Sequence, residues 1–217
     1  MQTVLLTGFE PFNGESLNPA WEAVRALESC QGNGFCITVR RLPCAFGLAL
    51  EVLEATLAQC RPAVVICVGQ AGGRAEMSIE RIAINIDDAR IADNRQHRPI
   101  DVPVVEGAPA AYFSTLPIKA IVHGLRENGI PAAVSQSAGT FVCNHVFYGL
   151  MHQLASNAST QDVRAGFIHV PFLPQQAACH PGAPSMALSD MITGLRTAVV
   201  ITLATRADLK VSEGRLD

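Results

Sequence analysis

The sequence predicts a single-domain α/β fold, a three-layer α/β/α sandwich with a mostly parallel twisted sheet. Apolar runs of strand length recur along the chain, as strands buried on both faces require. Segments with apolar residues at helical spacing separate most of these runs. The chain has 217 residues, of which 49% are hydrophobic, and it shows no internal repeat or linker. One core is therefore expected to include residues 1–217.

The predicted strands are apolar runs that each end at a loop or a bend. Residues 3–7, TVLLT, are typical of a strand buried on both faces. The full set of predicted strands is 3–7, 36–42, 62–68, 132–134 and 165–170. Since helices are predicted between most of them, the strands are expected to run parallel.

The predicted helices have apolar side chains on one face. Asn18 followed by Pro19 indicates an N-cap and a proline at the first helical position, so a helix is expected to run to about Glu28. Apolar residues at helical spacing predict four more helices, which include residues 46–57, 118–125, 147–154 and 188–199.

Three segments depart from this alternation. Residues 77–93 alternate less regularly and contain Asp87-Asp88, which predicts a β-hairpin outside the main sheet. Residues 94–107 are polar and contain prolines, which is typical of a surface loop. The charged tail 208–217 is expected to fray.

Composition excludes several classes of function. A net charge of −3 without a basic cluster argues against nucleic-acid binding. The longest apolar helical stretch, 197–205, is too short to span a bilayer, so no membrane association is expected. The seven cysteines contain no CxxC pair, which argues against a disulfide framework or a zinc site and favours a reducing cytoplasm. We expect no metal and no cofactor.

Cys143 lies where a short apolar run and a polar bend give way to a helix. The unpaired backbone N–H groups and the dipole at a helix N-terminus favour a thiolate, which is a nucleophile. The alternative is a buried cysteine that packs as a small apolar residue.

Other polar residues are expected near Cys143, because the carboxyl ends of parallel strands meet at one edge of a sheet. His169 lies near the end of one predicted strand, and Glu80 follows the glycine-rich loop 69–73. A cysteine, a histidine and an acid from separate strand ends fit a thiol hydrolase. The alternatives are a core histidine and a surface glutamate paired with Arg81.

Two further features are candidate ligand sites. His145 and His152 lie seven residues apart on one helical face, are expected to be solvated, and lack a third metal ligand. The loop 69–73, GQAGG, is neither GxGxxG nor a Walker loop, so its glycines either contact a ligand or only let the backbone turn. A non-catalytic α/β protein that binds a small ligand or nucleoside, or a phosphorylase-like enzyme, is the alternative function.

Three segments of the chain resemble the pyroglutamyl-peptidase I family of cysteine exopeptidases. They are 69–85, GQAGGRAEMSIERIAIN; 130–144, which ends in SAGTFVCN; and 167–174, FIHVPFLP. The opening TGFEPFNGESLNP and residues 88–94 are also similar to the family. The resemblance implies Cys143 as nucleophile, His169 as general acid and base, and Glu80 as the acid that orients His169.

The resemblance also implies a substrate and its contacts. The substrate would be a peptide that begins with L-pyroglutamate. The Cys143 N–H and Arg90 would stabilise the oxyanion, although Arg90 has an alternative salt bridge to Asp87 or Asp88. The proposed substrate-binding residues are Phe9, Phe12, Asn18, Gln70, Phe141 and Val142. The aromatic residues would line an apolar slot or form a satellite core, and Asn18 is also the predicted N-cap.

The family often forms homodimers or homotetramers, so the same is expected here. Two positions depart from the family pattern. Ala92 stands where the family has proline, and a glycine is expected near Gln96. Both departures concern the conformation of the loop around residues 94–107 rather than the chemistry.

Overall fold

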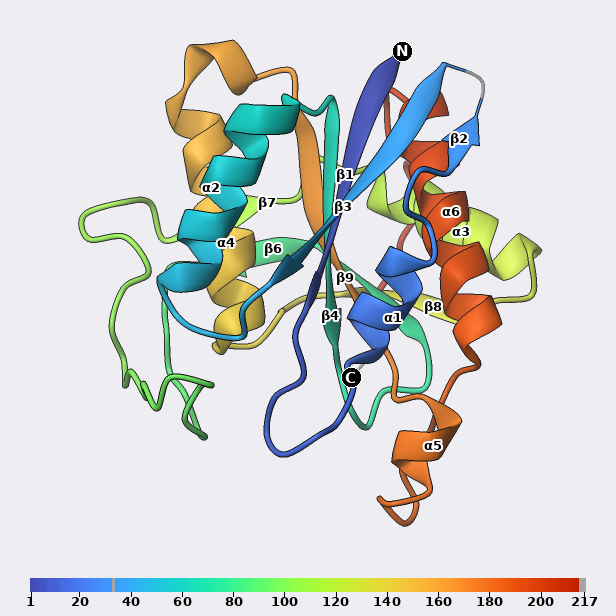
Figure 1. The fold of residues 1–217 in the computed structure, drawn as a ribbon. Helices are drawn as coiled ribbons and strands as arrows, with labels where there is room; N and C mark the ends of the chain where they lie inside the picture. The colour runs from blue at the N-terminus through green and yellow to red at the C-terminus, as the bar shows by residue number, and fades with distance from the viewer. Residues whose placement is uncertain (33, 215–217) are drawn as a thin grey trace.

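A seven-stranded sheet with helices on both faces forms the centre of the molecule (Figure 1). The structure is a computed structural model that describes residues 1–32 and 34–214. The strand order is β2-β3-β1-β4-β9-β5-β8. Among the described strand pairs of this sheet, β2–β3 and β5–β9 are antiparallel and the others are parallel. The predicted three-layer α/β fold with a mostly parallel sheet is confirmed.

The central strands follow the predicted apolar runs within a few residues. They are β1 (Gln2–Phe9), β2 (Gln31–Gly32), β3 (Phe35–Leu42), β4 (Val64–Gln70), β5 (Met77–Glu80), β8 (Ala132–Ser135) and β9 (Arg164–Val170). Side chains of β1 alternate between the two faces, so that Leu5 joins one core cluster while Val4 and Leu6 join the other. Both faces are covered, which explains the continuous apolar runs.

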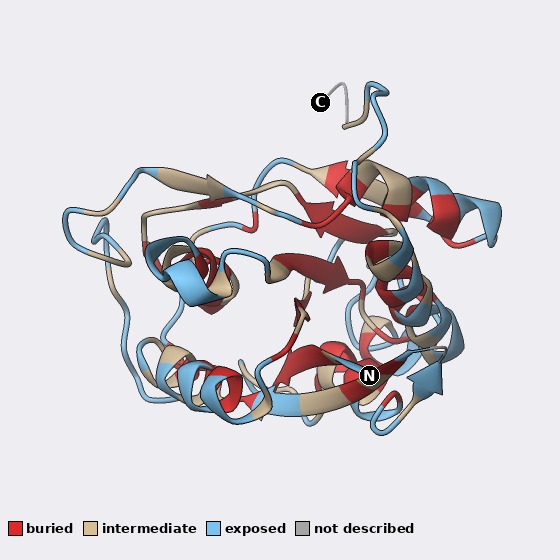
Figure 2. Ribbon diagram, turned by 90° about the horizontal axis from the view of Figure 1, so that it is seen from above, coloured by how far each residue is buried: buried red, intermediate tan, exposed pale blue. Residues whose placement is uncertain are grey.

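The helices divide into two layers. One face of the sheet carries α1 (Pro19–Arg25), α3 (Ile118–Glu127) and α6 (Leu188–Ala204), and the other carries α2 (Leu48–Cys60) and α4 (Val142–Ser156). Two short helical segments, α5 (Pro174–Ala177) and a 3₁₀ turn (Ala158–Thr160), complete the chain. Figure 2 shows the buried residues on the strands and on the helix sides that face them.

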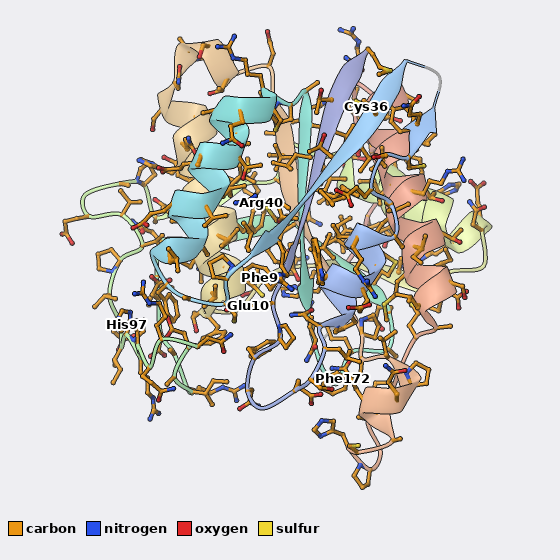
Figure 3. The ribbon with its side chains drawn as sticks, in the orientation of Figure 1. Phe9, Glu10, Cys36, Arg40, His97 and Phe172 are labelled. Carbon is orange, nitrogen blue, oxygen red and sulfur yellow. The ribbon has the colours of Figure 1, made fainter. Side chains whose placement is uncertain are left out.

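The carboxyl ends of the parallel strands meet at one edge of the sheet. From β1 the chain passes to β3 on one side and then returns to β4 on the other, so the strand order reverses there. Ligands of open α/β sheets bind outside such a reversal. In Figure 3, Phe9 and Glu10 at the end of β1 and Phe172 after β9 lie toward this edge, and Cys36 near the start of β3 lies toward the opposite one.

The prediction of a β-hairpin over residues 77–93 is wrong. β5 is a strand of the main sheet, where it pairs with β9 and β8. β6 (Ile82–Ile84) pairs instead with β7 (Ala111–Phe113) in a separate two-stranded sheet. Asp87 forms a bridge with Val102 rather than a turn with Asp88. Pairing with distant strands replaces the local hairpin because it buries the apolar residues of β5 completely.

The 94–107 segment is a loop, as predicted, and hydrogen bonds hold it at both ends. Asn94 donates to the Glu10 carboxylate and to the Pro11 carbonyl, while the Val105 N–H donates to Asn85. Gln96, near the position where the family has glycine, has a φ of 64°. This left-handed conformation favours glycine, so the backbone keeps the turn although the residue differs.

The tail does not fray over residues 208–214. Both carboxylate oxygens of Asp208 accept hydrogen bonds from the first turn of α3, from the N–H groups of Lys119 and Ala120. Glu213 forms a salt bridge with Arg126 at 2.8 Å. The tail is ordered because it satisfies helix donors that the preceding Pro117 does not cap. Residues 215–217 lie outside the described part of the chain.

Replacing Asp208 with alanine should lower the free energy of unfolding by about 1 kcal/mol, since the first turn of α3 loses its cap. Thermal or urea unfolding measures the change. Lys210→Ala is the matched control, because Lys210 is an exposed residue of the same tail. Equal stability of Asp208→Ala and wild type would mean that the tail does not stabilise α3.

None of the helices in the described residues is long and apolar enough to cross a membrane. All seven cysteines are free. A disulfide framework is therefore excluded for this structure, as the spacing of the cysteines predicted.

Candidate active site

Cys143 lies in the first turn of α4, at the carboxyl edge of the sheet. Phe141 is the N-cap residue, with an extended backbone, and no side chain of the described residues caps the helix. The first-turn N–H groups therefore remain available to an anion. The Cys143 side chain is half-buried.

The thiol of Cys143 lies over the backbone of Gly69. A Cβ atom added to Gly69 would lie 2.8 Å from the Cys143 sulfur and 2.8 Å from the ring of Phe167. Gly69 is in turn the register partner of His169 in the β4–β9 pair. The glycine therefore lets the sulfur approach the strand that carries His169. Close approach of protein atoms at Gly69 is neither of the two alternatives given for the loop 69–73, a ligand contact or a backbone turn.

His169 and Glu80 form a buried pair beside this thiol. The Nδ1 atom of His169 lies 2.8 Å from the Oε1 atom of Glu80, and their side chains are 5% and 0% exposed. The Phe167 ring lies 4.8 Å from the His169 ring, between centroids. An ionised carboxylate only accepts hydrogen bonds, so Nδ1 carries the proton and Nε2 is left as an acceptor. His169 is thus buried, as in the alternative of a core histidine, but it is hydrogen-bonded to the Glu80 carboxylate.

Glu80 is held in its ionised form. Burial alone would raise the pKa of the Glu80 carboxyl, but the hydrogen bond and charge of His169, a hydrogen bond from Ser135 and the charge of Arg74 lower it below its ordinary value. Arg74 lies 2.8 Å from Oε1 of Glu80. The alternative of a surface glutamate paired with Arg81 is wrong, because Arg81 instead donates to Gln136 and to the Glu213 carbonyl.

Burial opposes the thiolate expected at the helix N-terminus. Burial raises the pKa of the Cys143 thiol well above its usual range, and Cys44 and Glu80 raise it further, while Arg74 lowers it. Loss of hydration outweighs the favourable helix end. A neutral thiol needs a base to become a nucleophile. The Nε2 atom of His169, which is left as an acceptor, can serve as that base.

Three aromatic rings gather next to Cys143. Phe141 lies 6.2 Å from Phe12 and 5.4 Å from Phe46, between ring centroids, and all three side chains are half-buried. Sequence reasoning assigned Phe46 only to a helix stripe. Its position between Pro43 and Gly47, in a loop after a predicted strand, was the available signal.

Phe9 and Val142 are core residues rather than walls of an open slot. Phe9 is 2% exposed and packs 6.3 Å from Phe167, and Val142 is fully buried in the same core cluster. Their apolar side chains are drawn into the space between sheet and α4. Of the predicted aromatic wall, Phe12 and Phe141 remain on the side of the site.

Asn18 and Gln70 are both engaged within the protein. Asn18 is 1% exposed, accepts a hydrogen bond from the Ala20 N–H and donates to the Glu10 carbonyl. It is therefore the N-cap of α1, and its amide is too deeply buried to face a substrate. The Gln70 side chain accepts a hydrogen bond from Gln176, so the backbone of Gln70 is the part left for a substrate contact.

Arg90 lies on a loop beside the residues that precede Cys143. Thr140 exchanges two hydrogen bonds with the backbone of Asp88, two residues before Arg90. Arg90 is exposed, and within the described residues it forms no salt bridge to Asp87 or Asp88. The alternative salt bridge is therefore not formed, and the charge remains available near the site.

The prediction of a solvated side chain is wrong for His145, whereas His152 is half-buried. His145 is 6% exposed; its Nδ1 lies 2.7 Å from Asp87, and its Nε2 accepts a hydrogen bond from the Gly47 N–H. His152 contacts the Tyr112 hydroxyl at 2.9 Å. Within the part of the chain that is described, no group of three or more histidine, cysteine or acidic side chains is arranged to hold a metal ion.

A cysteine thiol, an imidazole hydrogen-bonded to a buried carboxylate, and their place at the carboxyl edge of an α/β sheet define a cysteine hydrolase. Known proteins narrow this class. The sequence matches the family described as pyroglutamyl peptidase over residues 2–205. The chain belongs to the pyroglutamyl peptidase family.

Individual relatives agree with this assignment. The pyrrolidone-carboxylate peptidase of Cupriavidus taiwanensis is 61% identical over 216 residues, 100% of both chains. The crystal structure of pyroglutamyl peptidase I from Bacillus amyloliquefaciens has a TM-score of 0.94 and 43% identity, over 97% of this chain and 99% of that one. A mutant pyrrolidone carboxyl peptidase from Pyrococcus furiosus has a TM-score of 0.89 and 44% identity, over 93% and 98%.

Proposed function

We propose that this cysteine peptidase removes an N-terminal L-pyroglutamyl residue from peptides through a thioester on Cys143. The reaction and the substrate class follow from membership of the family. The observation that carries the assignment of residues is the buried His169–Glu80 pair beside a thiol held over Gly69.

In the first half of the reaction, the Cys143 thiol passes its proton to Nε2 of His169 as the sulfur attacks the pyroglutamyl carbonyl. Glu80 stabilises the imidazolium that forms, because its carboxylate already accepts the Nδ1 proton. The imidazolium then protonates the departing amine, which leaves a thioester. In the second half, His169 takes a proton from water and the hydroxide attacks the thioester carbonyl. The C–S bond then breaks, and His169 returns the proton to the sulfur, which releases pyroglutamate and restores the thiol.

The oxyanion is stabilised by the backbone N–H of Cys143 at the uncapped start of α4. One such donor contributes about 3 kcal/mol to comparable acyl transfers. Arg90 is the second donor in this proposal. This role is supported by the exposure of Arg90, which has no ion-pair partner among the described residues, and by the loop that Thr140 holds next to Phe141 and Cys143.

The pyroglutamyl ring is an uncharged lactam, so an apolar slot with few polar contacts suits it. Phe12 and Phe141 supply aromatic walls, and Phe46 adds a third that the sequence did not indicate. The backbone of Gln70, at the end of β4, is the proposed polar contact.

We also propose a homodimer or homotetramer in the cytoplasm. Exposed apolar side chains, Ile100 at 65% and Phe113 at 66%, support an interface between copies. Seven free cysteines suit a reducing compartment. Sedimentation of the purified protein tests the oligomeric state, and fractionation of cells tests the cytoplasmic location.

The proposal is tested by release of a chromogenic amine from an L-pyroglutamyl amide. The reduced protein should cleave this amide, ignore the L-glutamyl amide, and lose activity after iodoacetamide treatment. The glutamyl amide is the matched control, since its open, charged side chain does not fit an apolar slot. Absence of cleavage by folded, reduced protein would instead favour a non-catalytic protein that binds a small ligand.

A further inference from the structure

Arg74 contacts the proposed catalytic acid but takes no part in the proton transfers above. We propose that Arg74 is a positioning residue that keeps Glu80 ionised and in place, so that His169 retains the tautomer that accepts the Cys143 proton. This inference rests on the roles proposed for Glu80 and His169.

A single oxygen of Glu80 accepts both hydrogen bonds. The Oε1 atom lies 2.8 Å from Nη1 of Arg74 and 2.8 Å from Nδ1 of His169. The other oxygen, Oε2, is buried without a hydrogen-bond partner in the described residues. The arginine and the histidine therefore hold the same carboxylate oxygen, and the hydroxyl of Ser135 also acts on this carboxylate.

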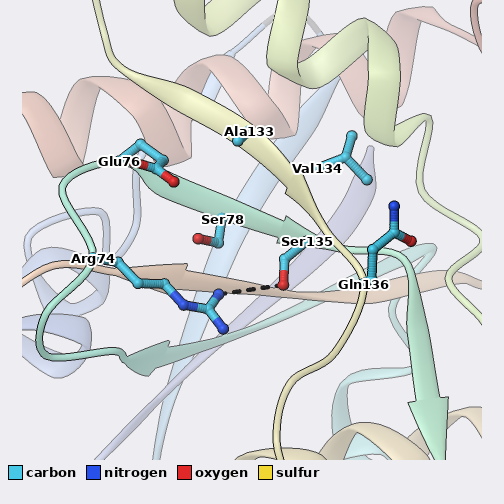
Figure 4. Close-up of a pocket in the computed structure, with 7 residues that line it drawn as sticks. All are labelled: Arg74, Glu76, Ser78, Ala133, Val134, Ser135 and Gln136. Atoms are coloured by element: carbon cyan, nitrogen blue, oxygen red, sulfur yellow. Dashed lines mark hydrogen bonds between the residues drawn. The ribbon is translucent and has the colours of Figure 1, made fainter. Parts of the chain in front are cut away.

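The arginine is itself held on the far side of Glu80. It donates to the Ser135 hydroxyl at 3.4 Å and to the Ser137 carbonyl at 3.3 Å. Figure 4 shows the Arg74 side chain extending past Ser78 toward Ser135. Arg74 thus joins the loop after β4 to the segment that leads from β8 to Cys143, and its guanidinium has a fixed direction.

The charges explain why this contact matters for the chemistry. The groups that act on Glu80 are His169 from β9, the hydroxyl of Ser135 from β8, Arg74 from the loop after β4 and Cys143 from α4. Only Arg74 carries a permanent positive charge among these. A buried carboxylate without a cation tends to take up a proton.

A protonated Glu80 would donate to Nδ1 of His169 instead of accepting from it. His169 would then carry its proton on Nε2, and it could no longer accept the thiol proton. Loss of the Arg74 charge would therefore favour the tautomer of His169 that cannot accept the thiol proton.

The place of the Arg74 guanidinium is accessible to small molecules in solution. Arg74 lines a pocket of about 300 Å³ with Glu76, Ser78, Ser135 and Gln136. Its side chain is 31% exposed, whereas that of Glu80 is 0% exposed. A small cation can therefore reach the place of the guanidinium when the side chain is removed.

The experiment measures kcat/KM against pH for Arg74→Ala, with and without millimolar guanidinium chloride. We expect a fall of about 10- to 100-fold at neutral pH, by analogy with the loss when a residue that orients the ligands of a metal site is removed. The loss of activity on the acid side should begin at higher pH than in wild type. Guanidinium should restore activity, and urea, which is planar but uncharged, should not.

Two variants serve as controls. Arg81→Ala removes the neighbouring arginine, which bonds Gln136 and Glu213 and not Glu80, and it should keep the wild-type pH profile. Arg74→Lys keeps a charge and should retain the acid side of the profile, and it provides the same comparison if Arg74→Ala does not fold.

The inference is overturned if Arg74→Ala keeps the wild-type profile. It is also overturned if its activity is lower by the same factor at every pH and guanidinium does not restore it. Failure of the proposed function would be seen separately, because wild type itself would then not cleave the pyroglutamyl amide.

Discussion

Replacing Cys143 with alanine should lower kcat for an L-pyroglutamyl amide by at least about 10⁴-fold, since no other described thiol occupies the place above Gly69. The thioester cannot form, and the oxyanion donors and the binding slot alone leave only residual catalysis. Steady-state and single-turnover assays measure the loss. A thioester intermediate, trapped by acid quench in wild type, should be absent from the variant.

Cys179→Ala is the matched control, because Cys179 is an exposed free cysteine. It should retain wild-type activity and remain sensitive to iodoacetamide. Wild-type activity in Cys143→Ala would remove Cys143 from the mechanism and return it to the alternative of a packing residue. Circular dichroism of both variants ensures that the comparison is between folded proteins.

Replacing Glu80 with glutamine should lower kcat by about 10³- to 10⁴-fold, as for the acid of other catalytic triads. The amide cannot stabilise the imidazolium, and its NH₂ group can turn toward Nδ1 and favour the wrong tautomer of His169. Glu51→Gln, on the exposed side of α2, is the control and should be fully active. Activity of Glu80→Gln within a few-fold of wild type would exclude Glu80 from the site.

The same substitution has a consequence for stability with pH. Because the pKa of Glu80 is lowered in the folded protein, its ionisation stabilises the fold above the unfolded carboxyl pKa of about 4.3. That contribution is lost as pH falls through the lower, folded pKa. Glu80→Gln should therefore unfold at a lower temperature than wild type at neutral pH, and the difference should shrink in acid. A constant difference at all pH values would contradict this linkage.

Much of the fold could be predicted from local patterns. The apolar runs of β1, β4 and β9 and the stripe of α3 depend on neighbours a few residues away, which the sequence shows directly. The N-cap Asn18 and the proline after it are likewise local. These elements together determine an α/β sheet with its carboxyl edge as the candidate site.

Pairing between distant segments could not be predicted in this way. β5 has a short, irregular pattern that fits a hairpin, and only its burial between β9 and β8 selects the main sheet. The charged tail has the composition of a frayed end, yet Asp208 caps α3 across 88 residues of chain. His145 looks solvated on its helix, but Asp87 and Gly47 enclose it.

The sequence by itself determined the fold class, the family resemblance and the segments that carry Glu80, Cys143 and His169. Only the tertiary structure decided the environment of these groups: the sulfur over Gly69, the burial that raises the pKa of Cys143, and Arg74 on Glu80. Desolvation and charge depend on every atom near a group, including those far away in the chain. The sequence pattern therefore identifies the reacting residues, but it does not show the burial and the nearby charges that set their pKa values.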